Sequence, residues 1–332
     1  MKGQKQPVAV VLVNLGTPEA PTTSAVRGFL REFLSDPRVV EIPRFLWLII
    51  LNLFVLTFRP KPVSEAYKEI WTDRGSPIRW ITEDQANGIR LELEERFSDA
   101  KITVTHAMTY GEPRIHETLD GLYQSGHRRI IVLPMYPQYS GSTTGAVCDQ
   151  VASYMQRARA MPSITMINSY FYNGSYISAL SESIRSYWES EGRGDHLLFS
   201  YHGIPESYVA KGDPYTGHCE CTTGAVAAKL GLDQHDYTMA YQSRFGKAEW
   251  VKPYTDKTIE ELASKQVKTL DVVCPAFSAD CLETIEEIAG ENAELFEKSG
   301  GAKLRLIPCL NASDRHIKAL SDILSPHLEA IL

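Results

Sequence analysis

Short runs of β-branched and other apolar residues alternate along the chain with longer segments of helical periodicity. Because these runs are apolar without a clean alternation, they predict strands that are covered on both faces. The runs lie at 8–13, 101–107, 129–133 and 164–167 in the first half, and at 196–200, 236–240, 270–273 and 304–307 in the second. Amphipathic patterns predict helices at 82–97, 177–191, 255–266 and 313–332.

This alternation of strands and helices predicts parallel sheets with helical crossovers. Four strands in each half indicate an α/β fold with two similar doubly wound domains, each a four-stranded parallel sheet flanked by helices. We place the first domain at 1–165 and the second at 166–312. A C-terminal helix at 313–332 is expected to pack back on the body of the protein formed by these two domains. The halves share no sequence identity that would mark a repeat.

One segment breaks the pattern. Residues 45–58, FLWLIILNLFVLTF, contain only Asn52 and Thr57 as polar residues, with prolines and basic residues on both sides. A bilayer span needs about 20 apolar residues, so this segment is too short to cross one. It reads either as a buried core helix or as a surface helix that meets a membrane or covers an apolar ligand.

Composition narrows the class of protein. The 332 residues are 43% hydrophobic and 23% charged, which excludes a mainly disordered, collagenous or multi-span membrane protein. The length favours two domains. With 34 basic and 41 acidic residues the net charge is −7, which argues against nucleic-acid binding and against a polybasic membrane anchor.

The cysteines and the N-terminus indicate a cytoplasmic protein. The N-terminal apolar run ends at Asn14 and Gly16 without a signal-peptide cleavage pattern. Six cysteines in so long a chain are expected to be free thiols in a reducing compartment. Cys219 and Cys221 form CxC rather than paired CxxC motifs, so buried or inert thiols are favoured over a zinc or iron–sulfur cluster.

Two loops after predicted strands of the first half are candidates for ligand contact. Residues 14–18, NLGTP, form either a structural turn or a ligand contact, and they lack GxGxxG. Residues 134–145 gather hydroxyls before a helix, which suits a phosphate or a carboxylate. There is no GxxxxGK[ST], and Tyr136 and Tyr139 beside the hydroxyls suit a flat aromatic acid better.

Candidate catalytic groups follow strands of the second half. His202 comes directly after an apolar strand and before a Gly/Pro turn, so it is expected at the carboxyl edge of the sheet. An imidazole there is structural, a base near neutral pH, or a ligand for a divalent metal. Glu283, Glu287 and Glu291 are spaced i, i+4, i+8, which stacks them on one helix face. They form either a solvated acidic face or a row that binds or guides a divalent cation.

Taken together, these motifs resemble the ferrochelatase family. The matching stretches are VLVNLGTP (11–18), DRGSPI (73–78), MYPQYSGSTTG (135–145), FSYHGIP (199–205), GDPY (212–215), YQSRFGKAEWVKP (241–253) and CPAFSADCLETIEE (274–287). They span about the whole chain, and S-x-H-G-x-P with L-E-T-x-x-E is the most specific part. The resemblance implies two similar doubly wound domains with the porphyrin in the cleft between them.

The resemblance also implies roles for individual residues. His202 and Glu283 are the implied Fe²⁺-binding and catalytic pair, with Glu287 and Glu291 as an acidic ridge leading away from Glu283. The implied substrate-binding residues are Leu15, Tyr136 and Trp250 against the porphyrin, and Ser76, Ser140 and Thr143 as propionate or structural partners. The family's apolar lip matches residues 45–58, which favours a surface role with possible peripheral membrane contact for this segment.

The implied activity is insertion of Fe²⁺ into protoporphyrin IX with release of two protons, the last step of haem biosynthesis. Iron is a substrate, so no cofactor is expected. A [2Fe-2S] cluster is not expected either, because the chain stops without a C-terminal extension and Gly141 stands where some cluster-bearing members have a cysteine. Neutral His202 suits either metal ligation or proton acceptance, and distortion of the macrocycle by a tight apolar site lowers the barrier.

Three alternatives stay open from the sequence. The nearest is a related chelatase acting on coproporphyrin or sirohydrochlorin. Coproporphyrin has more carboxylates and is less apolar than protoporphyrin, so the apolar segment 45–58 favours protoporphyrin. The second is a non-catalytic haem or metal carrier. The third is a nucleotide-binding α/β protein, against which the missing phosphate-loop lysine argues.

Overall fold

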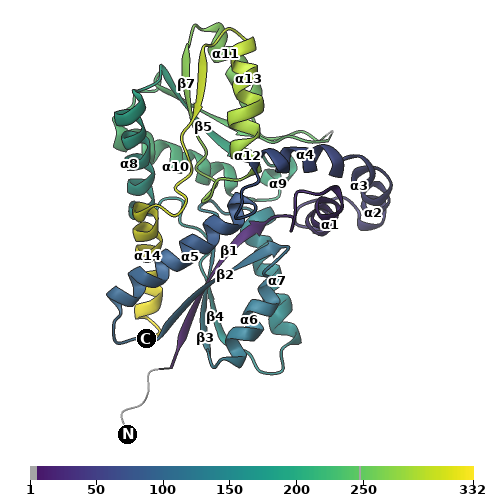
Figure 1. The fold of residues 1–332 in the computed structure, drawn as a ribbon, viewed down its shortest axis with the longest axis vertical. Helices are drawn as coiled ribbons and strands as arrows, with labels where there is room; N and C mark the ends of the chain where they lie inside the picture. Colours follow the sequence, from purple (N-terminus) through teal and green to yellow (C-terminus); the bar gives the residue numbers. More distant parts are fainter. Residues whose placement is uncertain (1–5, 247) are drawn as a thin grey trace. The chain divides into compact units, whose positions relative to one another are not determined.

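The computed structural model describes residues 6–246 and 248–332 and divides the chain into two compact units (Figure 1). The first unit comprises Met1–Tyr136, Ser140–Ser169 and Ala312–Leu332, and the second comprises Pro137–Tyr139 and Tyr170–Asn311. The boundary expected after residue 165 lies inside the fourth strand, and the C-terminal helix belongs to the first unit.

Each unit contains a four-stranded parallel sheet, and the two sheets have the same strand order. The first sheet consists of β1 (Val8–Gly16), β2 (Ile102–Tyr110), β3 (Arg129–Pro134) and β4 (Ser163–Met166) in the order β2-β1-β3-β4. The second consists of β5 (His196–His202), β6 (Tyr237–Gln242), β7 (Thr269–Val273) and β8 (Lys303–Leu306) in the order β6-β5-β7-β8. The predicted fold class and all eight predicted strands are confirmed, and strand ends differ by at most three residues.

Helices cover both faces of each sheet. The first unit has α1 (Thr23–Leu34), α2 (Arg44–Ile50), α3 (Leu56–Phe58), α4 (Pro60–Ile70), α5 (Pro77–Arg96), α6 (Ile115–Gln124), α7 (Ala146–Arg157) and α14 (Asp314–Glu329), with π-helical turns η1 (Leu51–Val55) and η2 (Gly141–Gly145). The second unit has α8 (Gly174–Glu191), α9 (Glu206–Ala210), α10 (Tyr215–Leu230), α11 (Thr255–Ser264), α12 (Leu282–Ile285) and α13 (Ala293–Lys298), with the π-helical turn η3 (Glu287–Asn292).

The central strand β1 shows why the sequence pattern is continuous rather than alternating. Ala9, Val11 and Val13 pack into a core with α6 and α7. Val10 and Leu12 alternate to the other face, where α5 lies (Figure 1), and they are equally buried. Because both faces are covered, every position of the strand is apolar.

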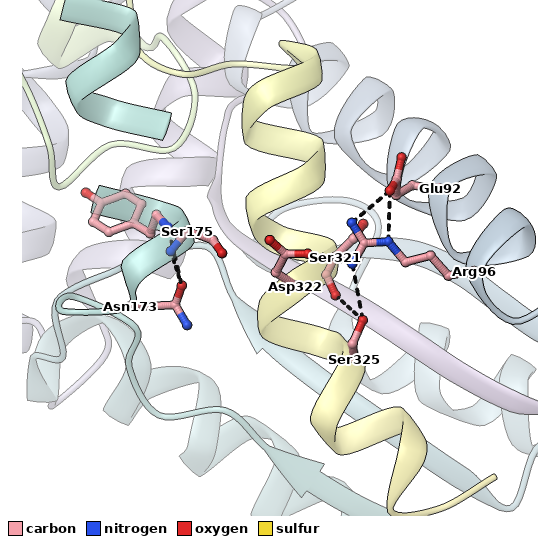
Figure 2. Close-up of polar contacts among 8 residues, drawn as sticks. Glu92, Arg96, Asn173, Ser175, Ser321, Asp322 and Ser325 are labelled. Carbon is pink, nitrogen blue, oxygen red and sulfur yellow. Dashed lines mark hydrogen bonds and ion pairs between the residues drawn. The ribbon is translucent and has the colours of Figure 1, made fainter. Parts of the chain in front are cut away.

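The C-terminal helix α14 lies against α5 within the first unit (Figure 1). The two helices come so close at Gly88 that a Cβ there would lie 2.8 Å from Ile317 Cδ1. Further along, Arg96 bonds Glu92 on its own helix at 2.8 Å and Asp322 on α14 at 2.6 Å (Figure 2). The close approach at Gly88 and the charge cluster around Arg96 thus hold α14 at two points along α5.

The apolar lip, residues 45–58, is helical but not one regular α-helix. Its chain runs through α2, η1 and α3. Trp47, Leu51 and Leu56 point inward and are buried, and Trp47 Nε1 donates to Leu34 O at 2.5 Å. Phe45 and Phe58 lie on the outer face and are 77% and 69% exposed. The segment is therefore a surface element with one anchored face.

No single helix among residues 6–246 and 248–332 is long and apolar enough to cross a membrane. Arg44–Phe58 and Pro60–Ile70, bent by 54°, meet the length and composition test only as a pair.

In the second unit, the core beneath the sheet combines strand and helix side chains. Leu198 of β5 and Val272 of β7 pack with Ile259 of α11 and Phe296 of α13. The strand β7 also carries Asp271, a buried carboxylate that pairs with Arg305 at 2.7 Å and accepts from Trp188 Nε1 and Gly194 N at 2.8 Å each. The charge is compensated by donors on three different segments.

Figure 2 also shows how α8 begins. Asn173 Oδ1 accepts from the backbone N–H groups of Ser175 at 3.0 Å and Tyr176 at 3.3 Å. This is an N-cap of the usual kind, and it starts the helix three residues before the predicted onset at 177.

Candidate active site

The strand order places the candidate residues at a topological switch point in each unit. In the second unit the chain leaves β5 for β6 on one side and later returns to β7 on the other. Ligands of open α/β sheets bind at the carboxyl ends of the strands where the direction reverses. His202 is the last residue of β5, and Glu283 follows β7 in α12. The predicted position of His202 at the carboxyl edge of the sheet is confirmed.

One hydrogen bond of His202 selects its tautomer. The half-buried imidazole bonds the carbonyl oxygen of Gly203 through Nδ1 at 2.7 Å. A carbonyl only accepts, so Nδ1 carries the hydrogen, and in the neutral ring the lone pair lies on Nε2. That lone pair is the group that binds a metal ion or accepts a proton.

Glu283 lies at the second position of the short helix α12. The helix is capped by Cys281, whose sulfur accepts from the backbone N–H of Thr284, while Thr284 Oγ1 accepts from Cys281 N at 3.0 Å. This reciprocal cap fixes the start of the helix. The half-buried Glu283 is thereby held on a defined backbone, and its carbonyl oxygen accepts from Gln242 Nε2 at 2.7 Å.

Glu287 is held by three donors. Ser243 N donates to Oε1 at 2.8 Å, Ser243 Oγ donates to Oε2 at 2.5 Å, and Gln242 Nε2 donates to Oε2 at 3.3 Å. Burial nevertheless raises the pKa of the Glu287 carboxyl, with a smaller contribution from nearby Glu283, while Ser243 and His202 oppose the rise. These effects place His202, Glu283 and Glu287 in one electrostatic neighbourhood.

The acidic row does not lie on a regular α-helix as its spacing predicted. A π-helical turn begins at Glu287, and Glu291 N bonds the oxygen of Glu286, five residues back. A π-turn carries more residues per turn than an α-helix, so the residues after Glu287 are placed around the axis differently from the predicted α-helical spacing. Glu283 and Glu287 are half-buried and Glu291 is exposed. The row therefore runs from the interior to the surface.

Gln242 and Ser243, which sequence reasoning did not single out, connect these groups. Gln242 is the last residue of β6 and is paired in register with His202 of β5. Ser243 has φ +66°, a left-handed conformation that is uncommon for a residue other than glycine. The available signal was a polar Gln-Ser pair directly after an apolar strand, at the same sheet edge as His202.

Trp250 packs against the turn that follows His202. It is buried, its Nε1 donates to Phe245 O at 3.0 Å, and its ring lies 5.2 Å from the Phe245 ring. A Cβ on Gly203 would lie 3.2 Å from Trp250 Cε3, so the glycine leaves room for the indole. The structure thus places Trp250 beside the His202 strand.

The other predicted substrate-binding residues lie in the first unit. Leu15 is half-buried in β1 at its carboxyl end, and Tyr136 follows β3, the neighbouring strand. They flank the switch point of the first sheet, equivalent to that of the second.

Three predicted hydroxyls lie near helix starts of this unit. Ser76 is the buried N-cap residue of α5, and its Oγ has no partner among the residues the structure describes. Ser140 caps the π-turn η2 and accepts from Ser142 N at 3.3 Å. Thr143 Oγ1 donates to Ser140 O at 3.3 Å, so it is engaged within its own turn. Of the three hydroxyls, that of Ser76 is the one without a hydrogen-bond partner among the described residues.

The arrangement in the second unit suits a divalent metal in passage. It offers an imidazole lone pair and two carboxylates, which are ligands that bind Fe²⁺. Within the described ranges no three His, Cys, Asp or Glu side chains gather closely enough to hold a metal ion. His202, Glu283, Glu287 and Glu291 are therefore arranged as a series rather than as one coordination sphere.

The cysteines are free thiols, and most of them are buried. Burial raises the pKa of Cys219, Cys274, Cys281 and Cys309 well above the ordinary thiol value. A buried thiol in its protonated form is a poor nucleophile and a poor metal ligand.

Solved structures with low sequence identity share this fold. SirB from Bacillus subtilis, solved with Fe³⁺, has a TM-score of 0.53 at 11% identity and covers 96% of this chain and 94% of its own. CbiX, described as the terminal enzyme of siroheme biosynthesis in denitrifying bacteria, has a TM-score of 0.53 at 11% identity, with 96% and 98% covered. At such identities the likeness establishes a chelatase-like fold.

Sequence relatives are much closer. The chain is 48% identical over 329 residues to a ferrochelatase of Idiomarina loihiensis, covering 98% of this chain and 90% of the relative. It is 48% identical over 321 residues to a ferrochelatase of Thioalkalivibrio sulfidiphilus, with 97% and 87% covered. The sequence model of the ferrochelatase family matches residues 7–328. The chain therefore belongs to the ferrochelatase family.

Proposed function

We propose that the protein inserts Fe²⁺ into protoporphyrin IX, forming protohaem and releasing two protons, as the last step of haem biosynthesis. The observation that carries the proposal is the His202 lone pair on Nε2, directed by the Nδ1 bond and placed at a switch point with Glu283 and Glu287 nearby. Membership of the ferrochelatase family supports the same reaction.

The geometry suggests which residues bind the metal, accept protons and contact the porphyrin. Metal insertion forms four iron–nitrogen bonds and removes the protons of two pyrrole nitrogens. Nε2 of neutral His202 accepts a proton or binds the metal, because it is a lone pair within a partly desolvated site. Glu283 binds the iron together with His202. Glu287 and Glu291 form a row between this partly buried site and the surface, along which protons or metal ions pass. Leu15, Tyr136 and Trp250 are the proposed porphyrin contacts, and the Ser76 hydroxyl is the proposed propionate donor.

Anaerobic turnover of Fe²⁺ with purified protein tests the proposal. Protoporphyrin IX, coproporphyrin and sirohydrochlorin are compared at equal concentration, and haem formation is followed by absorbance. We expect protoporphyrin IX to give the highest kcat/KM. A strong preference for another tetrapyrrole would contradict the proposed substrate. Porphyrin binding without Fe²⁺-dependent product would contradict the enzyme itself and would favour a carrier.

The reaction as proposed uses no resident cofactor. Iron and acid-labile sulfide are measured in the protein as purified, and we expect turnover by preparations that contain neither. Activity that requires a bound iron–sulfur cluster would contradict this part of the proposal.

The exposed side of the apolar lip supports a second element of the proposal, a peripheral contact with a lipid surface. Phe45 and Phe58 are directed outward, and Arg44, Arg59 and Lys61 lie exposed beside them. Apolar side chains beside cationic ones suit the boundary between acyl chains and anionic headgroups. The buried face of the same segment, with Trp47 and Leu51, anchors it to the first unit.

Charge placed on the lip tests this contact. In the double variant Phe45→Glu/Phe58→Glu, we expect partitioning onto vesicles of phosphatidylcholine and phosphatidylserine to fall at least about tenfold, since burying a phenyl group contributes roughly 1.5–3 kcal/mol. Co-sedimentation measures the bound fraction. The matched control is Leu91→Glu/Tyr172→Glu, which charges exposed apolar residues outside the lip. Equal losses in both double variants would exclude the lip as the contact.

A further inference from the structure

We infer that Gln242 is a positioning residue of the metal site, holding Glu287 and the Glu283 backbone in register with His202. The inference rests on the proposed function, since it concerns how the residues of that site are held in place. Gln242 contacts neither iron nor porphyrin in this assignment. It acts through the carboxylates.

Gln242 uses its full hydrogen-bonding capacity, although it is only 2% exposed. Its Oε1 accepts from Ser200 Oγ at 2.7 Å and from Cys274 Sγ at 3.7 Å. Its Nε2 donates to Glu283 O at 2.7 Å and to Glu287 Oε2 at 3.3 Å. An amide has two acceptor and two donor positions, and all of them are engaged here.

The neighbours fix which end of the amide is which. The carbonyl of Glu283 only accepts, so the atom beside it is the NH₂ group, and the oxygen faces Ser200 and Cys274. Ser200 has one hydroxyl hydrogen, which it gives to Gln242, so Thr255 donates to Ser200 at 2.9 Å. The chain of donors thus runs in one direction, from Thr255 through Ser200 and Gln242 to the carboxylate.

The backbone couples this chain to His202. Gln242 and His202 are paired across β6 and β5, and Gly203 N donates to Gln242 O at 2.8 Å. Ser200 lies two residues before His202 on the same strand. A single buried amide therefore connects the strand that carries the imidazole with the helix that carries the carboxylates.

Ser243 completes the arrangement. Its left-handed backbone, φ +66°, turns its N–H and its hydroxyl toward the two oxygens of Glu287. Strained backbone of this kind is unfavourable and persists where the surroundings enforce it. Together the two residues fix both the position and the rotation of one carboxylate. Partners that orient a metal ligand from behind change metal affinity or activity about 10-fold to 100-fold when they are replaced.

The test variant is Gln242→Met, which keeps the length of the side chain and removes all four hydrogen bonds. We expect the KM for Fe²⁺ to rise about 10-fold or more, with the KM for protoporphyrin IX within twofold of the wild-type value. Titration of the porphyrin-free protein with Co²⁺ alone, by calorimetry, should show a matching loss of affinity. A residue that only filled space would lower stability without separating the two KM values.

The matched control is Gln85→Met, which removes another buried glutamine, in α5 of the first unit. Gln85 lies outside the unit that contains His202 and the acidic row. We expect a comparable loss of stability and an unchanged Fe²⁺ KM. Ser200→Ala is the milder companion, because it removes one hydroxyl and leaves the amide to be held by Cys274 alone at its oxygen. It should weaken Co²⁺ binding in the same direction by a smaller factor.

A folded Gln242→Met protein with wild-type Co²⁺ affinity and wild-type Fe²⁺ KM overturns the inference. If Gln242→Met does not fold, unchanged Co²⁺ affinity in Ser200→Ala overturns it instead. Failure of the wild-type protein to insert Fe²⁺ would contradict the proposed function, and the Co²⁺ titrations would still decide the role of Gln242.

Discussion

At the scale of single residues, the hydrogen-bond partners of the ring nitrogens separate His202 from His127 and His196. His127 engages both ring nitrogens, one with Ser125 Oγ and one with Thr103 Oγ1. His196, at the opposite end of β5, is bonded through Nε2 to Thr238. His202 is bonded through Nδ1 to a carbonyl, which leaves Nε2 as the lone pair. The same side chain is thus structural in two places and chemically available in the third.

Replacing His202 with alanine should abolish metal insertion and spare the fold. We expect kcat to fall about 10²- to 10⁴-fold, the range typical of losing a general acid–base group. Haem formation and circular dichroism measure the two properties. His196→Ala is the control, since it removes a half-buried histidine from the other end of the same strand. Similar losses of kcat in both variants would contradict the catalytic assignment.

The raised pKa of Glu287 has a consequence for stability. A carboxyl whose pKa is higher in the folded chain than its ordinary 4.5 binds its proton more readily when folded. Between the two pKa values the folded state holds more protons than the unfolded state, so the free energy of unfolding falls as the pH rises through that window.

Glu287→Gln should remove this decline. We expect the variant and the wild type to be similar in stability at the low-pH end, and the variant to gain relative to the wild type as the pH rises above 4.5. Urea midpoints of the metal-free proteins, measured across pH, give the difference curve, in which the other titrating groups cancel. A difference that shrank with rising pH would have the wrong sign for a buried carboxylate.

At the scale of elements, two contacts inside the units illustrate how neighbouring elements are held: a helix pair in the first unit and a strand pair in the second. Gly88 lets α5 and α14 approach, whereas Gly121 in α6 has nothing within 4 Å of its Cβ position. Both are helical glycines. The first is required by packing, and the second is a site where alanine would suit the helix better.

Gly88→Ala should therefore destabilise the protein, while Gly121→Ala stabilises it by about 0.5–1 kcal/mol. At Gly88, overpacking of about 1–3 kcal/mol against Ile317 outweighs the gain in helix propensity. Chemical denaturation measures both variants. In an Ile317→Ala background the clash is gone, and Gly88→Ala should become stabilising. A destabilisation that persists in that background would assign the effect to something other than this contact.

The Asp271–Arg305 pair is the second element-scale contact, joining β7 and β8. Its side chains are 1% and 10% exposed, so neither charge is well solvated. Arg305→Met leaves Asp271 buried with only its neutral donors, and we expect a loss of about 3–5 kcal/mol in the free energy of unfolding. Arg38→Met breaks the exposed pair with Asp149 and should cost at most about 1 kcal/mol. Equal effects would show that burial does not set the value of these pairs.

At the scale of the whole molecule, the sequence predicted the architecture well. It did not predict Gln242 and Ser243, the residues that hold the carboxylates of the candidate site. The eight strands could be found because central parallel strands must be apolar on both faces, as in β1. His202 and Glu283 could be placed at one sheet edge because each follows such a strand. The outward side of the lip was not predictable, since a uniformly apolar run carries no periodicity that distinguishes Trp47 from Phe45.

Other features depend on contacts distant in sequence. The left-handed Ser243 and the π-turn at Glu287 support each other across 44 positions, and neither has a local signature that reveals the other. Membership of α14 in the first unit likewise depends on Gly88 and Arg96, more than 200 positions earlier in the chain. Periodicity identifies a helix and its apolar face, but the partner of that face is a property of the tertiary structure.

The place of α14 sets an order of events during synthesis. Except for Pro137–Tyr139, the second unit is one continuous stretch, Tyr170–Asn311, whereas the first unit needs Ala312–Leu332 to cover α5. Chains emerge from the ribosome N-terminus first, and domains generally fold as units as they appear. Here the unit that begins first is completed last. A nascent chain therefore carries an α5 whose side toward α14 stays uncovered until residues 312–332 are translated, and in that interval chaperones and proteases have access to it.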